Sequence, residues 1–245
     1  MPTLEALRAE EFDCVRRHFR PERRVLEIGG GSGYQASLIA STGAAVESID
    51  VAPGTETHFP VRLYGGGALP FPDQYFDVVF SSNVLEHIPD LDLSLAEIRR
   101  VMKPDALAIH ILPTPAWRAW TSLSHYIHIG RRIVGVLAGR GYAARASPVP
   151  AVTAVGPRGW RALRRLLADG PHGEYPSALA ELWYFSRRRW RQLFFDHGFE
   201  LLEDWPSGIF YTGYGIFPAL SVERRRKLAG VLGSATRVFI MRKRP

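Results

Sequence analysis

Apolar residues follow two spacings along this chain, and the two spacings alternate. Short apolar runs predict buried strands at residues 24–28, 45–49, 61–64, 76–81, 106–112, 199–205 and 236–241. Helical spacing of apolar residues predicts helices at residues 4–19, 34–42, 91–102, 186–197 and 222–232. Strands that alternate with helices in this way predict an α/β protein with a mostly parallel sheet and right-handed crossovers.

The alternation stops between residues 115 and 183. This segment holds Trp117, Trp120, several glycines and prolines, and a basic helix-like run at residues 160–167. We interpret it as an inserted helical cap. The chain then divides into residues 1–114, which carry the first five strands, the cap at 115–183, and residues 184–245, which complete the same sheet.

A glycine-rich run follows the first predicted strand. Four of the five residues at 29–33 are glycine, and a predicted helix begins at Tyr34. Glycine permits positive φ and has no Cβ to block a ligand, and the helix start offers free N–H groups. The next strand ends at Asp50, and an acid about 20 residues beyond such glycines binds ribose hydroxyls in doubly wound folds. The pattern therefore predicts a site for a nucleotide-like ligand.

Composition narrows the class of protein. The 245 residues suffice for one α/β domain with an elaboration, and 46% of them are hydrophobic, which indicates a folded chain. Cys14 is the one cysteine, so we expect neither an internal disulfide framework nor a cysteine-based zinc site. No apolar run reaches the roughly 18 residues of a membrane span, and no signal-peptide pattern is present. We therefore expect a cytoplasmic location.

Positive charge is concentrated in one region. Residues 116–200 hold 13 arginines and 5 acidic residues, a balance of +8, whereas the whole chain carries +7. This balance favours an anionic partner, and a solvated basic surface is the alternative. The aromatic and cationic residues at 116–140 suit a lid, or a helix on an anionic membrane surface at the inner face of the membrane. Since no RNA-binding module is recognised, we expect no specific nucleic-acid partner.

Four segments in fixed order resemble a known family. They are the glycine run, Asp50, the "LPF…FDVV" run at 69–79 and the Arg-Arg-Val-Met-Lys-Pro-Asp run at 99–105. The "NVLEH" run at 83–87 belongs to the same signature. Over residues 22–114 they resemble the class I S-adenosylmethionine-dependent methyltransferases. The resemblance implies a Rossmann-like fold with seven strands, mostly parallel with an antiparallel last strand, and S-adenosyl-L-methionine as cofactor. A nicotinamide cofactor fits less well, because residues 29–34 lack the last glycine of G-x-G-x-x-G.

The resemblance also implies a set of cofactor-binding residues. Glu27 and the glycines Gly29, Gly31 and Gly33 would enclose the methionine part, and Asp50 would bind the ribose hydroxyls. Val51 and Leu69 would lie near the adenine, and Asn83 would face the ammonium group. One feature departs from the family. An aspartate usually precedes the Leu-Pro-Phe run, but residues 65–68 are Gly-Gly-Gly-Ala. Either a backbone carbonyl replaces it or the adenine is held more loosely.

Two histidines are candidate catalytic residues. Transfer of a methyl group to a hydroxyl requires a base, and histidine suits this role near neutral pH. His87 ends the "NVLEH" run, where it either serves as that base or only closes the loop over the cofactor. His172 stands two residues before Glu174 in a polar stretch, so the two could form a base with its orienting partner or hold sugar hydroxyls. An exposed turn is the alternative for His172.

The remaining histidines suggest no further site. His110 falls inside a predicted strand and is expected in the core. His125 and His128 lie three apart on a predicted helix without a third ligand, so we expect no metal site. The sequence thus favours methyl transfer to oxygen of a small-molecule or glycan acceptor. The alternatives are an amine, lipid quinone or RNA acceptor, or an inactive cofactor-binding partner subunit. The oligomeric state stays open.

Overall fold

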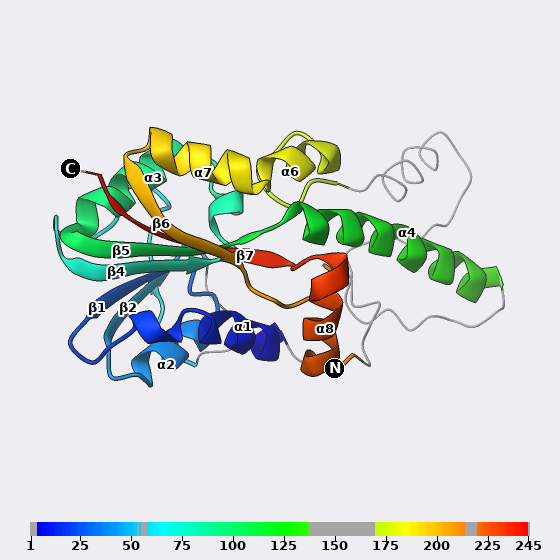
Figure 1. Ribbon diagram of the computed structural model, residues 1–245, viewed down its shortest axis with the longest axis horizontal. Coiled ribbons are helices and arrows are strands. Elements are labelled where there is room, and N and C mark those ends of the chain that lie inside the picture. Colours follow the sequence, from blue (N-terminus) through cyan, green and yellow to red (C-terminus); the bar gives the residue numbers. More distant parts are fainter. Residues whose placement is uncertain (1–3, 53, 55–57, 138–169, 214–219, 245) are drawn as a thin grey trace.

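A central sheet of seven strands organises the molecule (Figure 1). The computed structural model describes residues 4–52, 54, 58–137, 170–213 and 220–244. The strand order is β3-β2-β1-β4-β5-β7-β6, and β7 runs antiparallel to both of its neighbours. The strands are β1 (Arg24–Ile28), β2 (Ala45–Asp50), β3 (Arg62–Leu63), β4 (Phe76–Ser82), β5 (Met102–Pro113), β6 (Phe199–Pro206) and β7 (Thr236–Lys243). The predicted α/β fold with an antiparallel last strand is confirmed.

Helices cover both faces of the sheet (Figure 1). One face packs on α1 and α2 around a core that includes Phe12 and Ile39, and the other packs on α3 and α7 around a core that includes Leu95 and Trp190. The helices are α1 (Leu4–Asp13), α2 (Tyr34–Ala40), α3 (Leu91–Val101), α4 (Pro115–Leu137), α6 (Ala178–Tyr184), α7 (Arg187–Asp196) and α8 (Val222–Leu232).

Two predicted elements differ from the structure by more than two residues at one end. The predicted helix at 4–19 is α1 followed by the short 3-10 helix η1 (Arg16–His18), because the chain turns after Asp13 while Val15 and Phe19 stay buried. The predicted strand at 106–112 begins earlier, at Met102. Met102 pairs with Phe76, and an irregularity in the register of β4 and β5 accommodates the residues between. Proline is therefore tolerated near the start of β5.

The described part of the predicted cap consists of α4, the loop at residues 170–177 and α6. Figure 1 shows α4 leaving the sheet and extending well beyond it. Trp117 is 6% exposed, and the Trp120 indole donates to the Leu232 carbonyl at 2.9 Å. Trp117 therefore packs inward, and Trp120 is half-buried with its indole N–H already bonded. The membrane contact of residues 116–140 stays a prediction, and the basic run at 160–167 lies outside the described residues.

Within the part of the chain that the structure describes, no helix combines the length and the apolar character needed to cross a membrane.

Candidate functional site

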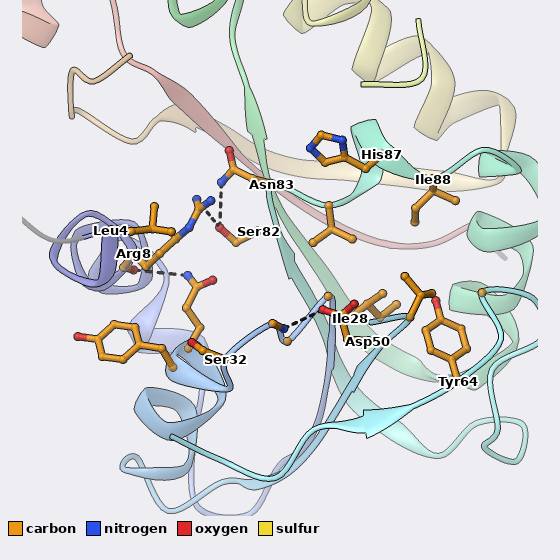
Figure 2. Close-up of a pocket in the computed structure, with 18 of the residues that line it drawn as sticks. Leu4, Arg8, Ile28, Ser32, Asp50, Tyr64, Ser82, Asn83, His87 and Ile88 are labelled. Atoms are coloured by element: carbon orange, nitrogen blue, oxygen red, sulfur yellow. Dashed lines mark hydrogen bonds between the residues drawn. The ribbon is translucent and has the colours of Figure 1, made fainter. Parts of the chain in front are cut away.

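A pocket of about 420 Å³ opens at the carboxyl ends of β1, β2 and β4 (Figure 2). Its volume lies in the range of small-molecule sites, and its place is where open α/β sheets bind ligands. Residues from α1, the glycine run, the end of β2 and the end of β4 line it: Leu4, Glu5, Arg8, Ile28, Gly29, Gly30, Gly31, Ser32, Tyr34, Gln35, Asp50, Val51, Tyr64, Gly66, Ser82, Asn83, Val84, His87, Ile88 and Pro89.

The glycine run forms one wall of the pocket. Gly29 has φ +78°, and a Cβ on it would lie 2.2 Å from Val84 Cγ2. Gly31 has φ +54°, and a Cβ on it would meet no described atom within 4 Å, because this residue faces open space. Gly29 is therefore required by the packing of the loop, whereas Gly31 keeps the backbone accessible to a ligand.

Asp50 connects the end of β2 with the glycine run. Its carboxylate accepts hydrogen bonds from the Gly31 amide at 2.8 Å and the Ala52 amide at 3.1 Å. Figure 2 shows Asp50 and Tyr64 on the same side of the pocket, and Val51, which also lines it, is 63% exposed. Two backbone donors thus orient a carboxylate whose remaining lone pairs can accept from vicinal hydroxyls.

Three predicted cofactor residues lie outside the pocket lining. Glu27 is buried beneath the glycine run, where its carboxylate accepts from the Ser48 hydroxyl at 2.6 Å. Gly33 starts α2 with φ +74° and packs against the Phe59 backbone. Leu69 is buried, and its amide donates to the Glu97 carboxylate at 2.7 Å. All three support the loops around the pocket, and their contact with a cofactor stays a prediction.

Glu27 gives the stability of the protein a characteristic pH dependence. Burial raises the pKa of its carboxyl to about 7, and the hydrogen bond from Ser48 only partly opposes this. The folded state therefore holds a proton that the unfolded chain releases above its ordinary pKa near 4.5. We expect the free energy of unfolding to decrease as pH rises from about 4.5 to about 7, and Glu27→Gln to reduce this decrease.

Urea unfolding at pH 5 and pH 7.5 measures the effect of Glu27. Glu47→Gln is the matched control, since Glu47 is an exposed carboxylate on the neighbouring strand β2. Equal pH slopes in wild type and Glu27→Gln would contradict the prediction.

Helix α1 contributes pocket residues that the sequence analysis did not assign to the site. Arg8 is the one arginine or lysine among the described lining residues. Its guanidinium donates to the fully buried Glu11 at 2.6 Å, and Tyr211 and Thr236 also donate to Glu11, at 2.7 and 2.8 Å. The spacing of Arg8 and Glu11 on a predicted helix was visible, but nothing in the sequence indicated that this helix covers the pocket.

Asn83 has an unusual backbone conformation at the end of β4. Its φ is +55°, its amide N–H donates to the Ile111 carbonyl at 2.8 Å, and its side-chain amide donates to Ser82 at 3.1 Å. Figure 2 shows Asn83 and Ser82 beside Arg8. Asn83 therefore lines the pocket as part of a polar group that Arg8 and Ser82 share, and its contact with the cofactor stays a prediction.

His87 and His172 are neighbours although 85 residues separate them in the sequence. His87 ends the short 3-10 helix η2 (Leu85–His87) that follows β4 and lines the pocket. Its ring centroid lies 4.6 Å from that of His172, which in turn lies 4.6 Å from Trp117. Partial desolvation lowers the pKa of both imidazoles, so both are neutral at pH 7.

The carboxylate that fixes the His172 segment is not the predicted one. The Glu181 carboxylate accepts the backbone N–H groups of His172 and Gly173, both at 2.6 Å. Glu181 also contacts Arg118 Nε at 2.9 Å, and both side chains are buried. Glu174 instead donates its backbone N–H to the Glu86 carbonyl and acts electrostatically on His87. Helix α6 brings Glu181 back to His172, which spacing alone did not reveal.

His110, which lies in β5, belongs to the core. His110 is fully buried, its Nδ1 lies 2.7 Å from the Ser81 hydroxyl, and burial lowers its pKa to about 3. The expectation of a core position is confirmed.

Comparisons with known protein sequences identify a family. The profile of a family described as "Methyltransferase domain" matches residues 5–204. An uncharacterized methyltransferase of Mycobacterium marinum is 35% identical over 120 residues, which cover 43% of this chain and 46% of that protein. The ubiquinone/menaquinone biosynthesis C-methyltransferase UbiE of Cupriavidus metallidurans is 28% identical over 121 residues, which cover 44% of this chain and 50% of the relative. The chain thus spans about half the length of these relatives.

Solved structures share the fold. A SAM-dependent methyltransferase from Archaeoglobus fulgidus superposes with a TM-score of 0.57 at 17% identity, covering 98% of this chain and 94% of that one. A second structure is the 1,6-didemethyltoxoflavin-N1-methyltransferase of Burkholderia thailandensis, solved with bound 1,6-didemethyltoxoflavin and S-adenosylhomocysteine. It superposes with a TM-score of 0.54 at 15% identity, and the match covers 99% of this chain and 80% of that chain. At these identities the likeness concerns the fold.

Proposed function

Since the chain belongs to the methyltransferase domain family and has the fold of the class I S-adenosylmethionine-dependent methyltransferases, we propose that it transfers a methyl group from S-adenosylmethionine to a hydroxyl oxygen. The acceptor is a small molecule or a glycan precursor. When bound, the donor supplies an electrophilic methyl group on a positively charged sulfur. The protein's part is to align the acceptor with this methyl group and to exclude water.

The pocket residues fit the two ends of the donor. Asp50 accepts the ribose hydroxyls, and Val51 and Tyr64 lie beside it for contact with the adenine. Arg8 faces the pocket and pairs with the carboxylate of the methionine part. The backbone of Gly29 and Gly31 lies at the same pocket, where the same carboxylate can approach it. Asn83 is placed for the ammonium group of that part.

The pair His87 and His172 is the observation that carries the proposal of a hydroxyl acceptor. Both rings reach solvent, and His87 lines the pocket at the end of β4, away from Asp50 (Figure 2). A hydroxyl must lose its proton as it attacks the methyl group, and a neutral imidazole can accept that proton. The named relatives methylate at carbon or nitrogen according to their titles, so their names do not select the acceptor atom.

The cap provides the surroundings of these histidines. Trp117 and Arg118 come from α4, Glu181 comes from α6, and His172 precedes α6. We propose that residues 115–183 recognise the acceptor, while residues 1–114 and 184–245 complete the sheet that holds the donor.

Formation of S-adenosylhomocysteine with a panel of acceptors tests the proposed reaction. We expect turnover with phenols, catechols or sugar derivatives and not with matched amines. His87→Ala and His172→Ala should each reduce turnover about tenfold or more, because proton transfer by positioned groups contributes about 100-fold or more in total. His18→Ala is the control, since His18 lies in η1 outside the pocket.

Two results would contradict the proposal. Absence of S-adenosylhomocysteine binding at millimolar ligand in calorimetry would favour a partner subunit without catalysis. Turnover of amines, lipid quinones or RNA with no effect of the two histidine variants would replace the hydroxyl acceptor by one that needs no base.

A further inference from the structure

We propose that Glu86, His87 and His172 bind a divalent first-row transition-metal ion at the acceptor end of the pocket. One ligand atom from each of these three side chains lies within 4.8 Å of the other two. His87 belongs both to this cluster and to the pocket lining, so an ion held here faces the pocket. The role of the ion in catalysis rests on the proposed function, whereas its binding can be measured without an acceptor.

Glu86 distinguishes the cluster from an ordinary pair of histidines. Its side chain is 0% exposed, and neither carboxylate oxygen has a hydrogen-bond partner among the described residues. His87 Nε2 lies 3.9 Å from Glu86 Oε1, beyond hydrogen-bond distance. A buried carboxylate in this state is costly because nothing replaces its lost hydration. An ion between the carboxylate and the imidazoles supplies the missing partner.

Backbone contacts hold the two ligand-bearing segments together without using the ligand side chains. The Glu174 amide donates to the Glu86 carbonyl at 3.0 Å. Gly173 approaches the same carbonyl so closely that a Cβ on it would lie 2.3 Å from the oxygen. The glycine therefore permits His172 to stand beside Glu86 and His87.

The residues behind His172 fix its position further. Glu181 accepts the backbone N–H groups of His172 and Gly173 and is itself paired with Arg118. The Trp117 ring packs 4.6 Å from the His172 ring. Such supporting contacts orient metal ligands in known sites.

The donor set selects the class of ion. Two imidazoles and one carboxylate suit Zn²⁺, Fe²⁺, Co²⁺ or Mn²⁺, whereas Mg²⁺ and Ca²⁺ prefer oxygen ligands. Three protein ligands leave positions open for an acceptor, as in catalytic metal sites. Bonds of about 2.1 Å place ligand atoms roughly 3 to 3.5 Å apart. The 3.9 Å between Glu86 and His87 and the limit of 4.8 Å for the whole cluster therefore require the three side chains to close on the ion by up to about 1.5 Å.

Coordination changes how the acceptor loses its proton. The acceptor hydroxyl binds the ion through oxygen, which lowers the pKa of its O–H group, and the proton leaves to solvent water. The oxygen then forms a bond to the methyl carbon while the carbon–sulfur bond breaks. The electron pair of that bond stays on sulfur and gives neutral S-adenosylhomocysteine. When the ion is bound, His87 and His172 assist the loss of the proton as its ligands, which replaces the direct role as base described above for the metal-free pair.

Metal titration of the tag-free full chain, stripped with a chelator, tests the site. We expect one Zn²⁺ per chain in calorimetry and one Co²⁺ per chain by its visible absorption. Glu86→Gln and His172→Ala should each weaken binding about tenfold or more. Zn²⁺ should also raise the melting temperature of wild type and not that of Glu86→Gln, because only a binding-competent folded state is stabilised.

Glu86→Gln keeps the experiment decisive if His172→Ala misfolds. The glutamine has the shape of the glutamate, and no described hydrogen bond to its carboxylate is lost, so we expect the variant to fold. His18→Ala should bind the ion like wild type. No saturable binding of Zn²⁺, Co²⁺ or Mn²⁺, or equal binding in wild type and Glu86→Gln, would overturn the proposal.

The metal site and the proposed reaction can fail separately. Stoichiometric metal binding with turnover of amines only would retain the site and reject the hydroxyl acceptor. Turnover of hydroxyl acceptors that excess chelator does not change, in a chain that binds no metal, would retain the reaction and reject the site.

Discussion

Asp50→Ala should weaken the binding of S-adenosylhomocysteine by about 100-fold or more. The carboxylate is oriented by the amides of Gly31 and Ala52, and it faces the pocket from the end of β2. Two hydroxyls of a ribose donating to it form charge-assisted hydrogen bonds, each of which contributes about 1.5 to 3 kcal/mol. The alanine removes both bonds and also releases the Gly31 amide, so the glycine run loses one of its supports.

Calorimetry with S-adenosylhomocysteine measures the effect of Asp50→Ala, and circular dichroism checks that the variant is folded. Glu47→Ala is the matched control, because Glu47 is an acidic residue of the same strand that is exposed and lies outside the pocket. An affinity of folded Asp50→Ala within threefold of wild type would mean that the ribose does not bind at this carboxylate.

The fold could be predicted from the sequence because its signals are local. The strands β1 and β4 are short apolar runs, and the helices α3 and α7 show an apolar stripe, so the alternation of strands and helices was visible without any long-range contact. The start of β5 could not be predicted from the sequence pattern. Met102 enters the sheet only because it pairs with Phe76, and the residue preference at Lys103 and Pro104 gives no sign of that pairing.

The site could be predicted where a residue follows a strand and not where it depends on packing. Gly29, Gly31, Asp50, Asn83 and His87 all stand at or just after strand ends, and the structure brings them to one pocket. Arg8 comes from a helix whose docking place is set by buried contacts such as that of Glu11 with Thr236.

His172 needed information of the same kind, because it meets His87 through contacts that the sequence does not display. Its segment is held by Glu181, nine residues later, and not by Glu174. The sequence spacing favours Glu174 as the partner of His172, because it cannot show that α6 folds back and brings Glu181 to the same segment.

Arg118→Met and Glu181→Gln should each reduce the free energy of unfolding by about 3 to 5 kcal/mol. The two side chains are 2% and 0% exposed and lie 2.9 Å apart. Removal of one partner takes a close ionic contact away from the other buried charge, which is the costly way to break such a pair. For a chain of this size, the loss corresponds to a decrease of roughly 10 °C in melting temperature.

The double variant Arg118→Met with Glu181→Gln should be less destabilised than the sum of the two single variants, by about 2 kcal/mol or more. Both charges are then absent, while the glutamine oxygen still accepts from the His172 and Gly173 amides, so only packing and part of the hydrogen bonding are lost. Chemical denaturation of the four proteins gives this coupling energy. Single effects that add within about 0.5 kcal/mol would mean that the two side chains are stabilised by separate surroundings. In that case the position of His172 would not depend on Arg118, and Arg118→Met would leave both turnover and metal affinity unchanged.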